Sequence, residues 1–125
     1  MTGVRASVEI TIDTENLEAS AVFWERALGY RRVRERDGYV VLAGPEGDPR
    51  PGLIIQGVET VTPGKARVHM DLRVPDPAAE VERLTRLGAA ALREVDERAR
   101  GGSRWTVMVD PQGTVFCVCP AREER

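Results

Sequence analysis

The residues best suited to chemistry lie on two short stretches that share one design. In Val68–Val74, the two-residue period of a strand places the only histidine, His69, on one face with Asp71 and Arg73, opposite an apolar face. Sixty residues earlier, Glu9 holds the same position on a similar stretch. Imidazole and carboxylate groups can bind a metal ion or transfer protons. Alternatively, these residues form the solvated, ion-paired face of an antiparallel sheet.

Length and charge restrict the classes of protein. A chain of 125 residues suits one domain with a sizeable core. With 18 basic and 20 acidic residues the net charge is -2, which argues against a nucleic-acid partner. The first residues lack the pattern of a secretory signal, and no apolar run approaches the roughly 20 residues needed to span a membrane. We therefore expect a cytoplasmic protein without a nucleic-acid or membrane partner.

The two cysteines, Cys117 and Cys119, lie two residues apart in a predicted strand. This spacing puts their Cα atoms about 6.6 Å apart on one face, near the limit for a disulfide and poorly oriented for it. We expect two free thiols.

Each of the two stretches begins a series of elements, and the first series runs strand, helix, strand, strand, strand. Its helix is predicted over residues 17–28, because apolar residues recur at helical spacing and Gly29 follows, as a left-handed cap would. Phe23 and Trp24 of this helix are expected in the core. Asp37-Gly38 favours a primed two-residue hairpin turn between the second and third strands. The strands are predicted over residues 8–12, 31–36, 39–43 and 53–58.

The second series repeats this order. Asp76 and Pro77 cap and open its helix, and Val81, Leu84 and Leu87 are expected to face inward. Two copies of such a series predict two similar units that bury their apolar faces together in one domain. The later strands are predicted over residues 90–95, 104–109 and 115–119. The predicted organisation is one domain over residues 1–125, with module one at 6–58, a linker at 59–65 and module two at 66–120.

Three fragments resemble the vicinal oxygen chelate superfamily, which includes glyoxalase I, extradiol dioxygenases and bleomycin-resistance proteins. They are Leu17 to Tyr30, Val68 to Val74, and Asp110-Pro111-Gln112-Gly113 running into Phe116-Cys117, and they look most like glyoxalase-like domains. The resemblance implies an α+β fold in which two tandem βαβββ modules form a U-shaped, mostly antiparallel sheet cup with helices outside. It also implies a homodimer that binds a small molecule, but no particular reaction, because one scaffold hosts many functions.

The resemblance also implies a metal site. In metal-using members of the superfamily, four inward side chains bind a divalent ion, and their positions fall on Glu9, Gln56, His69 and Cys117. Periodicity agrees for three of them, whereas the strand that carries Gln56 is apolar on both faces. These donors would suit zinc, with the Gln56 amide as a weak ligand. The alternative is a cup without a metal ion.

Two departures argue against the best-known reactions of this superfamily. Cys117 stands where glyoxalase I keeps a glutamate that binds metal and moves the substrate proton, and one histidine cannot supply the two-histidine triad of extradiol dioxygenases. A metal-assisted lyase or isomerase with Glu9 or Asp71 as the base is the remaining enzymatic interpretation. The alternatives are a metal-free protein that binds an antibiotic or metabolite, and a domain that acts through its dimer surface alone.

Four further residues are predicted to contact the ligand: Thr11, Arg73, Trp105 and Cys119. Trp105 has two interpretations. It could pack under a helix with the valines that alternate after it, which the pattern favours, or it could form an aromatic surface for a flat ligand on the cup wall.

Overall fold

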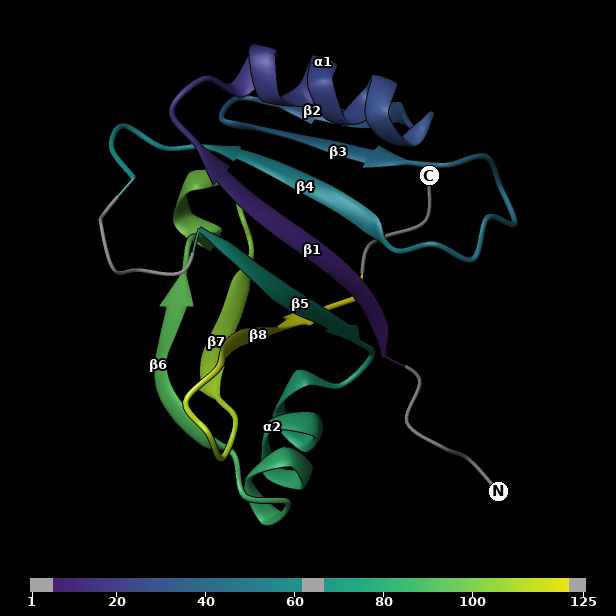
Figure 1. Cartoon of the computed structure of the whole chain (residues 1–125). Coiled ribbons are helices and arrows are strands. Elements are labelled where there is room, and N and C mark those ends of the chain that lie inside the picture. The colour runs from purple at the N-terminus through teal and green to yellow at the C-terminus, as the bar shows by residue number, and fades with distance from the viewer. Residues whose placement is uncertain (1–5, 62–66, 122–125) are drawn as a thin grey trace. The chain divides into compact units, whose positions relative to one another are not determined.

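The structure, a computed structural model, describes residues 6–61 and 67–121 and contains two series of elements (Figure 1). Each series runs strand, helix, strand, strand, strand, which confirms the α+β class and the two tandem βαβββ series. Residues 62–65 of the predicted linker lie outside the described residues. The elements are β1 Ser7–Thr14, α1 Leu17–Leu28, β2 Arg31–Arg36, β3 Tyr39–Ala43, β4 Gly52–Gly57, β5 Val68–Val74, α2 Pro77–Arg86, β6 Ala90–Asp96, the 3₁₀ turn η1 Arg98–Arg100, β7 Arg104–Val109 and β8 Val115–Pro120.

The chain divides into two compact units, and the two points of division fall inside β1 and β5. The first unit comprises residues 9–69, and the second comprises residues 70–121 with residues 6–8 among those described. The strands of the first follow the order β2-β3-β4-β1, and those of the second follow β5-β8-β7-β6. In each unit the first and last strands pair in parallel and the other pairs are antiparallel, as the mostly antiparallel sheet requires.

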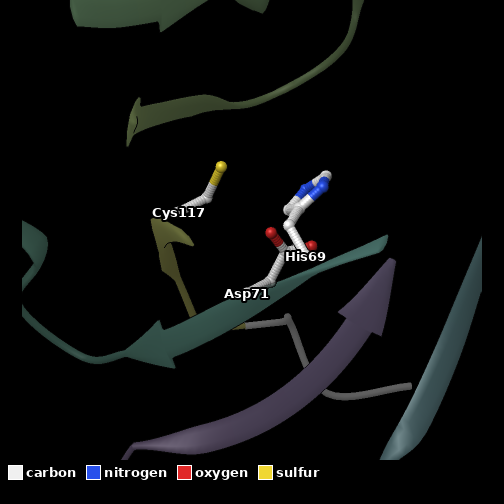
Figure 2. Close-up of side chains that lie close together, drawn as sticks. All are labelled: His69, Asp71 and Cys117. Atoms are coloured by element: carbon white, nitrogen blue, oxygen red, sulfur yellow. The ribbon is translucent and has the colours of Figure 1, made fainter. Parts of the chain in front are cut away.

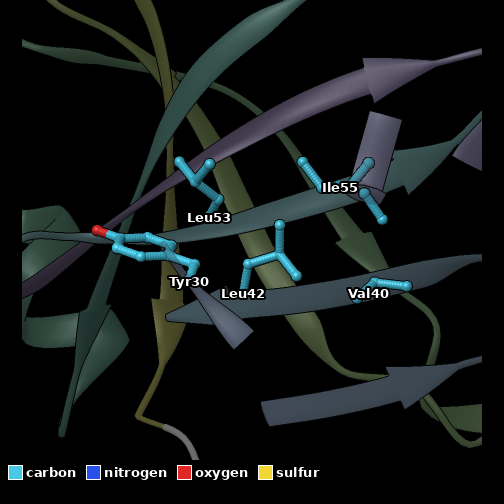
Figure 3. Packing of buried hydrophobic residues seen from close by; sticks show 6 residues of the cluster. Tyr30, Val40, Leu42, Leu53 and Ile55 are labelled. Atoms are coloured by element: carbon cyan, nitrogen blue, oxygen red, sulfur yellow. The ribbon is translucent and has the colours of Figure 1, made fainter. Parts of the chain in front are cut away.

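The core of the first unit forms where α1 packs on β3 and β4 (Figure 3). The apolar stripe of α1 contributes Ala21, which is fully buried, and Trp24, which packs against the cluster. The prediction that Phe23 is also in the core is wrong, since Phe23 is 60% exposed. One residue corresponds to about 100° of helical rotation, so Phe23 leaves the stripe and its ring meets the Trp24 ring edge-on. The cluster is completed by Tyr30, which directly precedes β2, and by the strand residues Val40, Leu42, Leu53 and Ile55.

The second unit has its own core beneath α2. Val81 and Leu84 pack against it as predicted, but Leu87 is 66% exposed, so its predicted inward position is wrong. The helix ends at Arg86, and Leu87 serves as its cap instead of continuing the stripe. At 12 and 10 residues, neither α-helix of the described chain is long and apolar enough to cross a membrane.

Glycines with positive φ end α1 and form the β2–β3 hairpin. Gly29 adopts the predicted left-handed conformation with φ 69°. The two-residue hairpin loop is also confirmed, but its primed type is wrong, because Gly38 has φ 93° while no described non-glycine residue, Asp37 included, has positive φ. The Gly38 carbonyl accepts a 2.8 Å hydrogen bond from the Gly57 amide, so the end of β4 holds the turn in its orientation.

Candidate functional site

In the first unit, Glu9, Thr11 and Gln56 lie on the sheet face that points away from α1. The two isoleucines of β1 pack towards α1, so the alternate residues point the other way. Strand β4 brings Gln56 to the same face, because Gln56 pairs with Asp13, two residues beyond Thr11. Thr11 is almost fully buried, Glu9 is half-buried and Gln56 is exposed.

The second unit uses the equivalent face, opposite α2, which we call its distal face. Asp71 and Arg73 of β5 point there, because their neighbours on the strand pack against α2. Asp71 pairs with Cys117 and Arg73 pairs with Cys119, so both thiols share this face. Both cysteines are free and buried, which confirms the prediction of two thiols.

Three predicted site residues converge at this face (Figure 2). One possible ligand atom from each of His69, Asp71 and Cys117 lies within 4.8 Å of the other two. Strand β5 supplies the imidazole and the carboxylate from positions two residues apart, and β8 supplies the thiol. Asp71 and Cys117 are each 6% exposed, and His69 is half-buried. No second group of three such side chains occurs within residues 6–61 and 67–121.

The donor set of this cluster fits a zinc ion. Zinc bonds to nitrogen, oxygen and sulfur are about 2.0 to 2.3 Å long, so two ligand atoms on one ion lie at most about 4.6 Å apart. The three ligand atoms lie within 4.8 Å of one another, so side-chain shifts well under one ångström would bring them to zinc-binding distances. Imidazole, carboxylate and thiolate are all ligands that zinc accepts, and three protein ligands are typical of a zinc site that also binds another molecule.

Burial raises the pKa of the Cys117 thiol to about 12. The negative charge of Asp71, the neighbouring Cys119 and a hydrogen bond with Asp71 act in the same direction, while the Arg93 guanidinium lowers this pKa. The metal-free thiol is therefore protonated at neutral pH. A metal ion that binds its sulfur has to displace this proton.

The remaining predicted contact residues of the second unit lie on the same sheet face as the cluster. Arg73 donates a 3.3 Å hydrogen bond to the Pro120 carbonyl at the end of β8. Trp105 is half-buried and packs with Val107, Cys117 and Cys119, in a cluster that contains no residue of α2. The favoured interpretation that Trp105 packs under a helix is therefore wrong, and its ring lies at the distal face.

Glu9 and Gln56, the other two predicted metal ligands, are not members of the three-residue group. Strand register shows how the two units correspond: Thr11 pairs with Ile54 as Asp71 pairs with Cys117. By this correspondence Gln56 matches Cys119, which lies two residues beyond Cys117 on β8. Asp71, which the sequence suggested as a base, stands among the possible ligands. Its spacing from His69 was visible in the sequence, but its proximity to Cys117 depends on the register of β5 and β8.

Sequence reasoning missed one charged residue of the distal face, Arg93 on β6. Arg93 pairs with Val107, which pairs with Cys117, which in turn pairs with Asp71. These four residues form one row across four strands, and cross-strand partners project from the same face. A register shift between Ala91 and Arg93 produces this placement, and a sequence pattern of strict alternation does not reveal such a shift.

Comparison with known proteins identifies the family. A family model described as a glyoxalase-like domain matches residues 9–119. The chain belongs to this family. The match confirms the resemblance to the vicinal oxygen chelate superfamily that the sequence fragments indicated. A search of curated proteins finds no match to this glyoxalase-like domain.

Solved structures share the fold of the glyoxalase-like domain over nearly its whole length. A glyoxalase/bleomycin resistance protein/dioxygenase superfamily member from Vibrio splendidus is 17% identical with a TM-score of 0.63, covering 93% of this chain and 99% of its own. Methylmalonyl-CoA epimerase from Mycobacterium tuberculosis is 20% identical with a TM-score of 0.62, and the match covers 94% of this chain and 88% of the epimerase chain. A hypothetical protein from Bacillus halodurans is 13% identical with a TM-score of 0.69, covering 99% of both chains. At these identities the similarity concerns the fold and not the activity.

Proposed function

We propose that this glyoxalase-like domain binds a small organic molecule at the distal face of its second unit and acts on it as a metal-assisted lyase or isomerase. The observation that supports this most directly is the convergence of His69, Asp71 and Cys117, with ligand atoms within 4.8 Å of one another. Zinc held by these residues would supply a Lewis acid that polarises a carbonyl or enolate oxygen of the ligand.

The side chains of this chain have distinct proposed roles. The predicted role of Glu9 as a base or a further metal ligand stays a proposal, because Asp71 belongs with the metal-binding group. A half-buried carboxylate such as Glu9 can act as a general base. Gln56 is proposed as a weak ligand. The residues proposed to contact the small molecule are Thr11, Arg73, Trp105 and Cys119.

The structural relatives support a small-molecule ligand in general terms. Methylmalonyl-CoA epimerase from Streptomyces coelicolor, in a complex with 2-nitronate-propionyl-CoA, is 17% identical to this chain with a TM-score of 0.64. A protein with this fold therefore binds an organic ligand of that size. A homodimer and a cytoplasmic location, which the sequence predicts, are part of the same proposal.

The second candidate function is a metal-free binding protein, and the apolar part of the distal face favours it. Val107 and Cys119 are buried there, and Trp105 and Val95 pack against them. Such a surface can hold an antibiotic or metabolite by apolar contact and ring stacking. In that case substitution of His69 would weaken ligand binding only modestly.

Metal analysis of purified protein separates these two functions. We expect about one zinc ion per chain after loading, and loss of that ion in His69→Ala and Asp71→Asn, because each substitution removes one donor. Asp37→Asn removes a carboxylate from the β2–β3 turn and should retain the zinc. If no ion binds after loading with zinc, iron, nickel or manganese, the metal-assisted function is wrong and the binding function remains.

A further inference from the structure

We infer that Arg93 recognises a carboxylate of the ligand, so that the molecule bound at the distal face is a small organic acid with an apolar body. This inference rests on the proposed function of that face. It adds a specificity-determining residue and a class of ligand. All the residues that carry it belong to the second unit.

Strand pairing places Arg93 at one end of a continuous row. Val107 lies between Arg93 and Cys117, and Asp71 forms the other end. Neighbouring strands are about 4.8 Å apart, so the backbones of Arg93 and Cys117 are separated by roughly 10 Å. An extended arginine side chain covers most of that distance. The effect of its guanidinium on the Cys117 pKa agrees with such a position.

A β-bulge determines which face Arg93 occupies. Ala91 pairs with Met108, a residue of the core beneath α2, whereas Arg93 pairs with the next residue of β7, Val107. Leu92 is the extra residue, and it is 55% exposed. Without the bulge, strict alternation of side chains along β6 would place Leu92 on the distal face and Arg93 on the face that α2 covers. Bulges are common beside functional sites, where they redirect a side chain.

The charge of Arg93 is also available for a ligand. Arg98 and Arg104, its neighbours in the β6–β7 hairpin, form ion pairs with Asp96 and Glu94. Arg73, on the same face, donates to the Pro120 carbonyl. For Arg93, in contrast, the described part of the chain supplies neither a carboxylate in an ion pair nor a side-chain hydrogen bond.

The side chains of the row from Arg93 to Asp71 restrict the chemical class of the ligand. The planar guanidinium fork matches a carboxylate, to which it can donate two parallel hydrogen bonds. In the protein without a metal ion, the buried Asp71 carboxylate at the other end of the row disfavours a second anion there. Between these ends the side chains are apolar, and the half-buried Trp105 packs against the buried Val107 and Cys119. An acid with a flat, uncharged body therefore fits this face better than a dianion or a sugar.

Two probes of equal shape test the role of charge. Benzoate and benzamide differ chiefly in the carboxylate, and their binding can be followed by NMR titration of amides on β6, β7 and β8. We expect wild-type protein to bind benzoate about tenfold more tightly than benzamide, the usual effect of a charge-assisted hydrogen bond. Arg93→Gln should abolish this preference. Arg104→Gln removes the same charge from the opposite face of the neighbouring strand and should retain it.

Repeating the titrations without zinc and with His69→Ala separates this inference from the proposed metal function. Preference for benzoate that depends on Arg93 in the absence of zinc supports the inference even if no metal binds. A preference that survives in Arg93→Gln and disappears with zinc removal shows that the metal holds the carboxylate, which overturns the inference. Equal binding of both probes, or no binding of benzoate to wild-type protein, also overturns it. So does tighter Arg93-dependent binding of phenyl phosphate, because the ligand would then be a phosphate.

Discussion

At the scale of single residues, the candidate site combines a buried carboxylate with a buried thiol. Asp71 and Cys117 are adjacent across β5 and β8 and are each 6% exposed. Two anions on paired residues of neighbouring strands, in a poorly solvated position, would repel each other strongly. The raised pKa of Cys117 means that its thiol stays protonated at neutral pH.

This protonated thiol makes stability depend on alkaline pH. The pKa of Cys117 rises from 9.0 to about 12 on folding. The stabilisation is therefore fully present below pH 9 and is lost as the pH rises through about 12, because the unfolded chain releases this proton first. We expect Cys117→Ala to show a flatter decline of the free energy of unfolding over this range in urea titrations.

Val107→Ala is the matched control for that measurement. It shortens a buried side chain of the same face without removing a titratable group. Its stability should be lower at every pH but should decline as steeply as that of the wild-type protein. Parallel curves for Cys117→Ala and the wild-type protein would contradict the assigned role of the thiol.

The sequence predicted individual site residues wherever alternation alone decides orientation. The spacing of His69 and Asp71 predicts that they share one face of β5, and the structure brings their side chains together. The placement of Trp105 depends on which face of the sheet α2 covers. The placement of Arg93 depends on the bulge at Leu92. A single strand's pattern contains neither kind of information.

At the scale of elements, α1 is defined at both ends by side-chain and backbone hydrogen bonds. The Asn16 side chain accepts a 3.1 Å hydrogen bond from the Ala19 amide at the start of α1. At its end, the Gly29 amide bonds to the Glu25 carbonyl. Arg32 of β2 then ties the helix to the sheet through ion pairs with Glu18 at 2.7 Å and Glu25 at 3.0 Å.

Substitution of Gly29 tests the end of α1. A Cβ at this position would have no atom within 4 Å, so the cost of Gly29→Ala comes from its φ of 69° alone. We expect a loss of about 1 kcal/mol in the free energy of unfolding, measured by urea denaturation. Gly29→Asn should lose less, because asparagine tolerates this conformation better. An alanine variant as stable as the wild-type protein would contradict this account.

Most elements follow from local signals in the sequence, but residues near helix ends and turns do not. The helix over residues 17–28 matches its prediction, because apolar spacing and the following glycine agree. Leu87 continued the apolar spacing of α2, yet the chain leaves the helix one residue earlier. In the β2–β3 hairpin, the hydrogen bond between Gly38 and Gly57 comes from a strand that is distant in sequence.

At the scale of the whole molecule, each unit has a core of its own. Leu42 is fully buried in the cluster beneath α1, and Met108 is fully buried in the cluster beneath α2. The duplication was visible in the sequence, because apolar patterns and turn residues recur about sixty residues apart. The pairing of the strands within each unit required the structure, because parallel partners such as β1 and β4 are distant in sequence.

Separate cores predict separate responses to core substitutions. Leu42→Ala should cost about 2 to 5 kcal/mol of stability, because it removes buried methyl groups and leaves a cavity. We expect hydrogen–deuterium exchange to accelerate mainly in residues 9–69. Met108→Ala is the matched variant and should accelerate exchange mainly in residues 70–121. Equal acceleration throughout the chain in both variants would show that the units open together.

The correspondence of the two registers has a consequence for engineering. In the first series of elements, Glu9, Thr11 and Ile54 occupy the backbone positions that His69, Asp71 and Cys117 occupy in the second series. Edge strand β2 even repeats the irregularity of β6, with a register shift between Arg32 and Arg34. The first half of the chain thus provides backbone positions equivalent to those that hold the three side chains in the second half. Copying three side chains from the second half would transplant its donor set onto a frame that already exists.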